Sequence, residues 1–299
     1  MPNRRALITS RTRWACTTAL ALLLTVRGLA AGPSFLWEAT GPQGGRLFLG
    51  GSIHQLSGEY YPLAPAFEEA FAASDLLVEE LDMAEMLAPQ SQMQLLTRGM
   101  MPAGQKLEAV VSPKTMSGVR EKVAELGLPL EPLQLFKPWA LALTLQSLEW
   151  QKAGFAADLG IDRHFYDRAL QRGMQVQGLE TLEYQVDQFD QMPMPLQDHM
   201  LSEALTELAT SKDKVVEMAE AWKSGDAAAV ERMVLQELKS EPEMYDRLLV
   251  QRNRTWMPKL EALFARAKPA FVVVGAAHLV GSDGLLAMLK ARGYSIRQL

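Results

Sequence analysis

The sequence predicts an α/β protein in which a mixed, partly parallel central sheet is covered by many helices within a single domain. Three observations support this prediction. Short apolar runs, typical of buried strands, gather near the two ends of the chain, with one more near the middle. Long stretches of helical character separate them, and such crossover connections favour parallel strands. No low-complexity linker divides residues 32–299, so we expect one domain there.

Residues 1–31 are expected to be a secretory signal peptide. Four arginines precede the apolar run Trp14–Val26, whose 13 residues are too few to span a membrane. Small residues up to Ala30 and Ala31 then supply a cleavage site. We therefore expect an exported protein, periplasmic or extracellular, with no stable membrane anchor after cleavage. An uncleaved anchor is the alternative.

Charge and cysteine content exclude several classes of function. The predicted signal carries five of the 30 basic residues and none of the 35 acidic ones, so the remaining chain has 25 basic residues and a formal net charge of −10. This balance argues against nucleic acid and anionic membranes as partners. The only cysteine, Cys16, lies inside the signal. The exported protein therefore has no cysteine nucleophile, no disulfide and no thiolate metal ligand.

Strands are expected where short apolar runs end in glycine, a turn or an acid. The first two flank a glycine-rich turn at 41–45 and should form an antiparallel hairpin. The expected strands are 34–40, 46–50, 76–81, 174–179, 271–274 and 294–298.

Helices are expected between the strands, and several carry end signals. Pro113 stands in a favoured first-turn position, and Gly173 and Pro269 each follow the end of a helical stretch. The expected helices are 63–73, 83–96, 112–127, 138–153, 160–172, 181–189, 196–208, 212–223, 226–238, 243–267 and 283–292.

One short phrase occurs twice, near the two ends of the chain. An apolar run leads into Gly51-Ser52-Ile53-His54 and another into Gly275-Ala276-Ala277-His278. Each histidine is thus expected just past the carboxyl end of a strand, where open α/β sheets bind ligands. A single Gly-x-x-His is a weak signal, and one histidine after a strand is more often a hydrogen-bonded loop residue. The chain has only four histidines, however, and half of them fall in this phrase.

Two acids, Glu80 and Glu180, follow other predicted strands. If these strands are parallel neighbours, both acids project over the same edge as His54 and His278. Two imidazoles with one or two carboxylates suit a divalent cation such as zinc, manganese or cobalt. The same residues could act without a metal, with a histidine as general base. Because side chains alternate along a strand, only one of Glu79 and Glu80 can face the site, and Glu80 fits better. For Glu180, the alternative is that it caps the helix that follows.

Three other polar residues have simpler interpretations. Arg252 lies in a helix before the last strands, and we expect it to hold a carboxylate, either a neighbouring glutamate or a substrate group. His164 lies on a predicted helix and is expected to be structural. His199 is expected at the surface.

The chain resembles the TraB/GumN family, which belongs with the Tiki-like proteins. The resemblance covers essentially the whole chain after the signal. It rests on the two Gly-x-x-His phrases and on Leu77–Asp82, Lys137-Pro138-Trp139, Gly160-Ile161-Asp162, Gly178–Thr181 with Gln185, and Arg252-Asn253 with Trp256.

The resemblance implies an α/β fold on a mixed sheet, shared in outline with erythromycin-esterase-like proteins. It also implies metal-dependent proteolysis, the activity described for Tiki members, in which paired Gly-x-x-His motifs and a glutamate act. Carried over, the metal ligands are His54, His278 and Glu80. We assign Glu80, Glu180 and Arg252 to catalysis. Unlike the Tiki proteins, this chain shows no membrane anchor after its last strand.

Three functions therefore compete. The first is an exported metal-dependent hydrolase, peptidase-like, that acts on a peptide or a small molecule. The second is a metal-free hydrolase of the esterase type that uses histidine and glutamate. The third is a non-catalytic protein that binds a peptide or signal.

Overall fold

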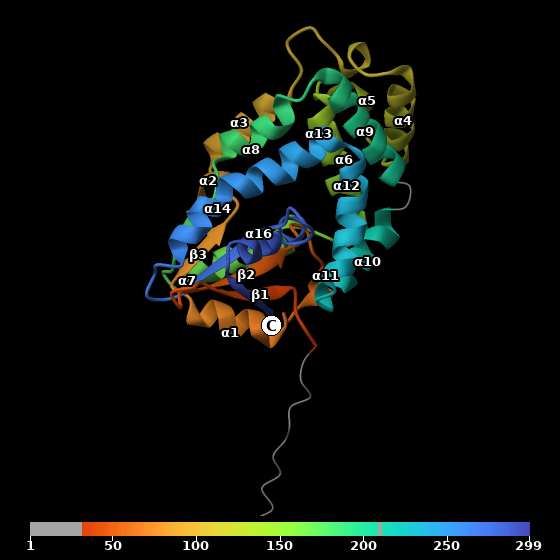
Figure 1. Cartoon of the computed structure of the whole chain (residues 1–299). Coiled ribbons are helices and arrows are strands. Elements are labelled where there is room, and N and C mark those ends of the chain that lie inside the picture. The colour runs from red at the N-terminus through yellow and green to blue at the C-terminus, as the bar shows by residue number, and fades with distance from the viewer. Residues whose placement is uncertain (1–31, 209–210) are drawn as a thin grey trace, which may run out of the picture. The chain divides into compact units, whose positions relative to one another are not determined.

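The computed structural model describes residues 32–208 and 211–299, so the predicted signal peptide lies outside the described residues. Residues 32–299 form one compact unit around a six-stranded sheet (Figure 1). The strands are β1 (Leu36–Thr40), β2 (Arg46–Ser52), β3 (Leu76–Glu79), β4 (Gln175–Gly178), β5 (Ala270–Gly275) and β6 (Ser295–Gln298). Their order across the sheet is β4-β3-β5-β2-β1-β6.

The sheet is mixed, and four neighbouring strands pair in parallel. β4, β3, β5 and β2 run in the same direction, whereas β1 pairs antiparallel with β2 and with β6. The β1–β2 pair is the predicted hairpin. The register places Gly51 of β2 beside Val274 of β5, and Glu79 of β3 beside Val273. The predicted fold class is thus confirmed.

Helices make up most of the remaining chain. The α-helices are α1 (Pro65–Ala73), α2 (Met83–Leu87), α3 (Pro89–Gly99), α4 (Pro113–Glu125), α5 (Leu130–Leu133), α6 (Pro138–Lys152), α7 (Ile161–Gln171), α8 (Leu182–Asp190), α9 (Met194–Leu208), α10 (Ser211–Lys223), α11 (Ala227–Val230), α12 (Gln236–Ser240), α13 (Pro242–Tyr245), α14 (Gln251–Leu263), α15 (Ala276–Leu279) and α16 (Leu285–Ala291). Short 3-10 turns lie at η1 (Gly58–Tyr60), η2 (Leu107–Ala109) and η3 (Ala157–Leu159), and π-helical segments at η4 (Glu231–Leu235) and η5 (Asp246–Val250).

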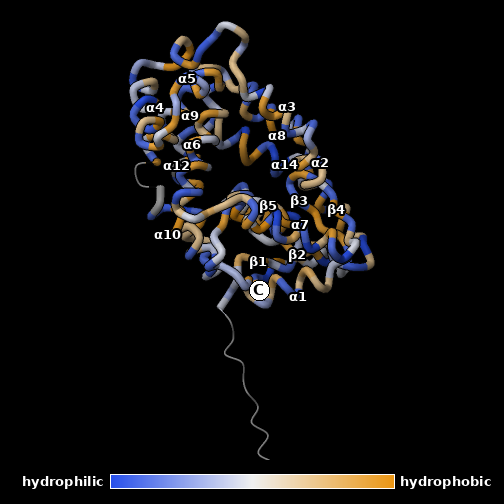
Figure 2. Tube along the Cα trace, turned by 180° about the vertical axis from the view of Figure 1, so that it is seen from behind, coloured by the Kyte–Doolittle hydropathy of each residue, from blue (hydrophilic) through white to orange (hydrophobic). Residues whose placement is uncertain are grey.

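The central strands are buried on both faces, as expected for parallel strands covered by helices. Every residue of β3 and β5 is buried, and Figure 2 shows hydrophobic residues concentrated along these strands. Helices α1 and α7 pack together through aromatic rings that also contact β5. Phe165 lies 4.7 Å from Phe271 and 5.1 Å from Phe71, measured between ring centroids. Figure 1 shows α14 and α16 on the other side of the sheet from α1.

A second apolar core lies among helices that precede and follow β4 in the chain. It joins α4, α6 and α9 through buried side chains such as Val119, Leu145 and Leu201. Helix α6 therefore belongs to a helical layer with its own packing. Within the described residues, no helix is long and apolar enough to cross a membrane.

Three details differ from the sequence prediction. The helix expected over 83–96 is two helices, because Ala88 precedes Pro89 and adopts extended backbone angles (φ −62°, ψ 136°). The helices expected over 226–238 and 243–267 are each interrupted by a π-helical segment, η4 and η5. His278 lies just past the end of its strand as expected, but in the short helix α15, which was not predicted.

Candidate functional site

The carboxyl ends of the four parallel strands meet at one edge of the sheet, and each is followed by a predicted site residue. His54 follows β2 by two residues, and Glu80 directly follows β3. Glu180 follows β4 by two residues, and His278 lies in the helical turn after β5. This edge is where open α/β sheets place ligand crevices. The condition set by the sequence, that these strands be parallel neighbours, is therefore met.

Glu80 lies at the centre of the site. Its Oε1 accepts a hydrogen bond of 2.7 Å from the backbone N–H of Gly275. The same oxygen lies 3.9 Å from His54 Nε2 and 3.8 Å from His278 Nε2. Gly275 has no side chain there, and a Cβ on it would lie 3.1 Å from both Glu80 Oε1 and His54 Nε2. The two Gly-x-x-His loops thus direct both Nε2 atoms toward one carboxylate oxygen.

Both imidazoles are held in one tautomer by an acceptor on Nδ1. His54 Nδ1 lies 2.8 Å from a carboxylate oxygen of Asp162, so it carries the proton. His278 Nδ1 lies 2.7 Å from Asn253 Oδ1. The Asn253 amide nitrogen donates to the carbonyls of His278 and Asp283, so its oxygen must be the acceptor. Each Nε2 consequently presents a lone pair toward Glu80 whenever its ring is neutral.

Arg252 links the two predicted carboxylates. Its Nε lies 3.1 Å and its Nη2 2.7 Å from Glu180 Oε1, while Nη2 also donates to Glu80 Oε2 at 2.5 Å. Trp256 Nε1 donates to Glu180 Oε2 at 2.8 Å, and Gln185 donates to Glu80 Oε2 at 3.3 Å. The expectation that Arg252 holds a carboxylate therefore agrees with these contacts, and the carboxylates it contacts are Glu80 and Glu180.

The third guanidinium nitrogen of Arg252 reaches a histidine. Arg252 Nη1 lies 3.1 Å from His278 Nε2 and 3.2 Å from the carbonyl of Leu248. Because a guanidinium can only donate, His278 Nε2 accepts in this contact, which agrees with a neutral ring protonated at Nδ1.

Burial and charge shift the pKa values of the site residues in opposite directions. Burial lowers the pKa of His278 to about 3, with Glu80 opposing and Arg252 assisting the shift. Attraction to Asp162 raises the pKa of His54 to about 9, although its side chain is 58% exposed, so solvent weakens this effect. Burial opposes ionisation of Glu80, but Arg252 and the histidines outweigh it and hold its pKa below the ordinary value.

Glu180 and Arg252 form a buried pair whose side chains are 2% and 8% exposed. Burial raises the pKa of Glu180, against the influence of Arg252 and the hydrogen bond from Trp256. The pKa of Arg252 is raised because Glu80 and Glu180 together outweigh its own burial.

The site residues are of the types that bind divalent cations, and their donor atoms are oriented toward one another. Two imidazole nitrogens and one carboxylate oxygen are common ligands of zinc, and each Nδ1 donates to an outer partner, as metal-binding histidines do. The position that a Cβ on Gly275 would occupy lies 3.1 Å from Glu80 Oε1 and His54 Nε2 and 3.6 Å from His278 Cδ2. In the arrangement described, the residues of 32–208 and 211–299 include no ready group of three such ligands, and Arg252 contacts His278 Nε2. Binding an ion to all three donors would therefore require the Arg252–His278 contact to open.

Glu79, the last residue of β3, takes no part in these contacts. It is 1% exposed, and neither carboxylate oxygen has a hydrogen-bond partner within the described part of the chain. Burial, with repulsion from Asp162 and other acids, raises the pKa of Glu79 to about 10. The alternation argument that preferred Glu80 therefore agrees with the contacts.

Replacing Glu79 by glutamine is expected to change how stability depends on pH. The folded protein keeps a proton on Glu79 up to pH about 10, whereas the unfolded chain releases it near 4.5. Stability should therefore fall as pH rises from 4.5, by about 3–4 kcal/mol at pH 7, and Glu79→Gln should remove this loss. Urea unfolding between pH 4 and 8 measures it, with exposed Glu69→Gln as control. Equal pH slopes for wild type and Glu79→Gln would contradict the prediction.

The remaining histidines stand apart from the site. His164 packs beside Tyr61 with a centroid distance of 5.0 Å, and His199 forms an ion pair of 2.9 Å with Glu241. Sequence reasoning assigned no role to Asp162 or Asn253, although both lay in the motifs that carried the family resemblance. Their positions beside the imidazoles depend on contacts between distant segments. The one local indication in the sequence that Asn253 belongs to the site was its position next to Arg252.

Comparisons with known proteins give a family and two relatives. The model of the TraB/PrgY/gumN family matches residues 35–298. Two uncharacterized proteins named YbaP, from Escherichia coli strain K12 and from Shigella flexneri, are each 29% identical to this chain over 280 residues. The match covers 90% of this chain and 99% of each relative. No solved structure matches.

Proposed function

Because the chain belongs to the TraB/PrgY/gumN family, we propose that it is an exported, metal-dependent hydrolase of the peptidase type. The observation that carries this proposal is the convergence of two tautomer-locked imidazoles on one carboxylate oxygen, Glu80 Oε1, beside Gly275. Family membership supports the fold and the paired motifs, and the site geometry supports the proposed reaction class.

The ion would be held by His54, His278 and Glu80. Zinc, manganese or cobalt suits this mixed nitrogen and oxygen set. Bound there, such an ion supplies Lewis-acid chemistry, which polarises a carbonyl and makes a water molecule more acidic. His54 is 58% exposed and His278 only 7%, so the substrate approaches from the side of His54.

The other residues orient these three. Asp162 and Asn253 fix the rings of the two histidines through Nδ1. Arg252 keeps Glu80 ionised and in place, and it is itself fixed by Glu180. Glu180 accepts hydrogen bonds from Arg252 and Trp256, so we assign it and Arg252 to positioning rather than to contact with the substrate.

A metal-free hydrolase is the second candidate, and one contact favours it. The His54–Asp162 pair places a carboxylate on Nδ1 of a ring whose side chain is 58% exposed, and a carboxylate on Nδ1 is how a general-base histidine is oriented. In that function His54 would take a proton directly from water or from a substrate group.

A cleavage screen with a chelator separates these functions. Purified protein without residues 1–31 is incubated with a peptide library, before and after chelation and after return of zinc, manganese or cobalt. We expect cleavage that chelation abolishes and one of the ions restores, that His54→Ala and His278→Ala lose, and that His199→Ala keeps. Chelator-resistant cleavage that needs His54 would favour the metal-free hydrolase. Peptide binding without any turnover would favour a non-catalytic binding protein.

The signal peptide carries its own prediction about export. The apolar run Trp14–Val26 and the small residues after it place cleavage after Ala30 or Ala31. The first residue of the exported protein is therefore expected to be Ala31 or Gly32. N-terminal sequencing of protein recovered from the periplasm or the medium measures this. An exported chain that still starts within residues 1–30 would refute it.

A further inference from the structure

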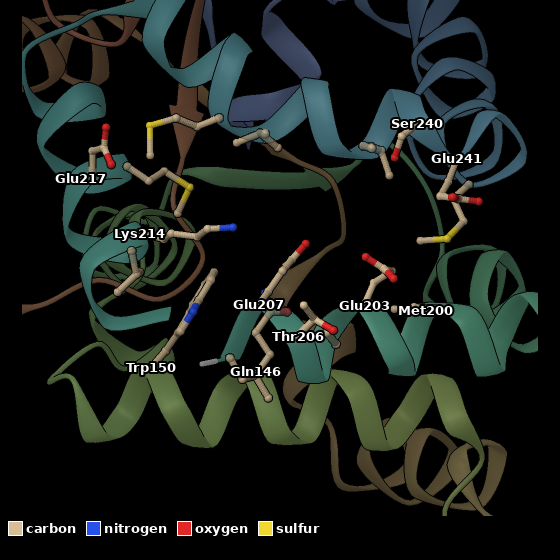
Figure 3. A pocket seen from close by; sticks show the side chains of 18 residues that line it. Gln146, Trp150, Met200, Glu203, Thr206, Glu207, Lys214, Glu217, Ser240 and Glu241 are labelled. Carbon is tan, nitrogen blue, oxygen red and sulfur yellow. The ribbon is translucent and has the colours of Figure 1, made fainter. Parts of the chain in front are cut away.

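A cavity of about 870 Å³ lies in the helical layer (Figure 3). Its wall comes from α6, α9, α10, η4, α12 and α13. The volume falls in the range of small-ligand and peptide subsites, which span about 300–1,000 Å³. None of the residues assigned to the site above lines it.

The wall is mainly apolar and rich in methionine. Met200, Met218, Met233 and Met244 line it together with Trp150. Methionine side chains are flexible and polarisable, and they are favoured on surfaces that accept varied apolar side chains. The wall is therefore suited to apolar side chains of differing shape.

The cavity also carries an excess of negative charge. Its lining includes four glutamates and one lysine: Glu203, Glu207, Glu217, Glu241 and Lys214. Figure 3 shows Glu203, Glu207 and Lys214 reaching into the cavity from α9 and α10. Glu203 and Glu217 are exposed, so their charge is available to a ligand. This charge complements lysine or arginine and disfavours anionic lipid headgroups.

Three helices that line the cavity also contact the segments that carry the site histidines. On α6, Ser147 accepts a hydrogen bond of 3.0 Å from Gln55, the residue after His54. On α10, Trp222 Nε1 donates to the carbonyl of Gly51 at 2.7 Å.

The third contact is made by η4 with the segment that follows His278. A Cβ on Gly281, three residues after His278, would come within 2.7 Å of Leu235 in η4. Elements that line the cavity therefore also contact the segments of both Gly-x-x-His motifs.

We propose that this cavity is a subsite for a polypeptide segment that combines apolar side chains with lysine or arginine. The inference rests on the proposed hydrolase function, because the cavity would receive part of the substrate while the paired motifs act on a neighbouring bond. The apolar side chains of the segment pack against the methionine side chains that line the cavity, and the basic side chains of the segment pair with Glu203 and Glu217.

The test is equilibrium binding of short fluorescent peptides, measured by anisotropy without any need for turnover. The probes are an alternating leucine–lysine peptide, a leucine–glutamate peptide and a serine–lysine peptide of equal length. We expect the leucine–lysine peptide to bind about tenfold or more tightly than either of the others. Equal binding of the two lysine peptides would overturn the proposal, because general attraction to an acidic protein would then suffice.

Charge-reversed variants locate the binding site. The double variant Glu203→Lys, Glu217→Lys should weaken binding of the leucine–lysine peptide about tenfold or more. The control is the double variant Glu69→Lys, Glu183→Lys, which makes the same charge change at exposed positions on α1 and α8 and should have little effect on binding. Met233→Trp, which fills the cavity without changing charge, should weaken binding too. Equal losses in both charge-reversed pairs would overturn the proposal. Selective binding without cleavage of any peptide would refute the hydrolase function and leave the subsite standing.

Discussion

Replacing Arg252 by alanine is expected to lower the free energy of unfolding by about 3–5 kcal/mol. The side chains of Glu80 and Glu180 are 8% and 2% exposed, and both form ion pairs with the Arg252 guanidinium. Without it, the two buried carboxylates lose the charge that they share, since Trp256 and Gln185 supply only neutral hydrogen bonds and His54 lies 3.9 Å from Glu80 alone. Urea unfolding at neutral pH measures the change.

Arg254→Ala is the matched control, because Arg254 is exposed two residues along the same helix. Arg252→Lys separates charge from geometry. A lysine restores one positive charge but not the fork that reaches Glu80, Glu180 and His278 together, so it should fold and lose most activity. A loss below about 1 kcal/mol in Arg252→Ala, close to that of Arg254→Ala, would show that the pair is not buried as described.

Adding one methyl group at Gly275 is expected to weaken metal binding about 10–100-fold while the fold survives. The backbone there (φ −48°, ψ 135°) is open to any residue, so alanine causes no backbone strain. Its Cβ would lie 3.1 Å from Glu80 Oε1 and from His54 Nε2, in the space between the donors. Metal titration and thermal unfolding of Gly275→Ala measure both effects.

Gly58→Ala is the control for this substitution, because a Cβ at Gly58 meets nothing within 4 Å. If Gly275→Ala binds metal as tightly as Gly58→Ala, the space above Gly275 is not where the ion lies.

Local patterns predicted the strands and the placement of the main site residues. Buried parallel strands are recognisable from continuous apolar runs, and the glycine that ends each run placed His54 and His278 at the strand ends. The acid after β3 could be narrowed to Glu80 because side chains alternate along a strand.

What the sequence could not predict depends on contacts between distant segments. Asp162 reaches His54 across 108 residues, and Arg252 reaches Glu80 across 172. Helical periodicity also does not reveal interruptions such as η4 and η5, since π-helical segments are short, rare turns inside otherwise α-helical stretches. The methionine-rich cavity arises from the packing of six elements, so no local pattern indicates it.

The most direct test of the shared metal site is isothermal titration of zinc, manganese and cobalt into the wild type and three alanine variants. The account predicts that the wild type binds at least one of these ions at a single site. His54→Ala and His278→Ala should both lose that site, and His199→Ala, whose histidine pairs with Glu241 away from the sheet edge, should keep it. A wild type that binds none of the three ions, or two histidine variants that lose different sites, would contradict the account.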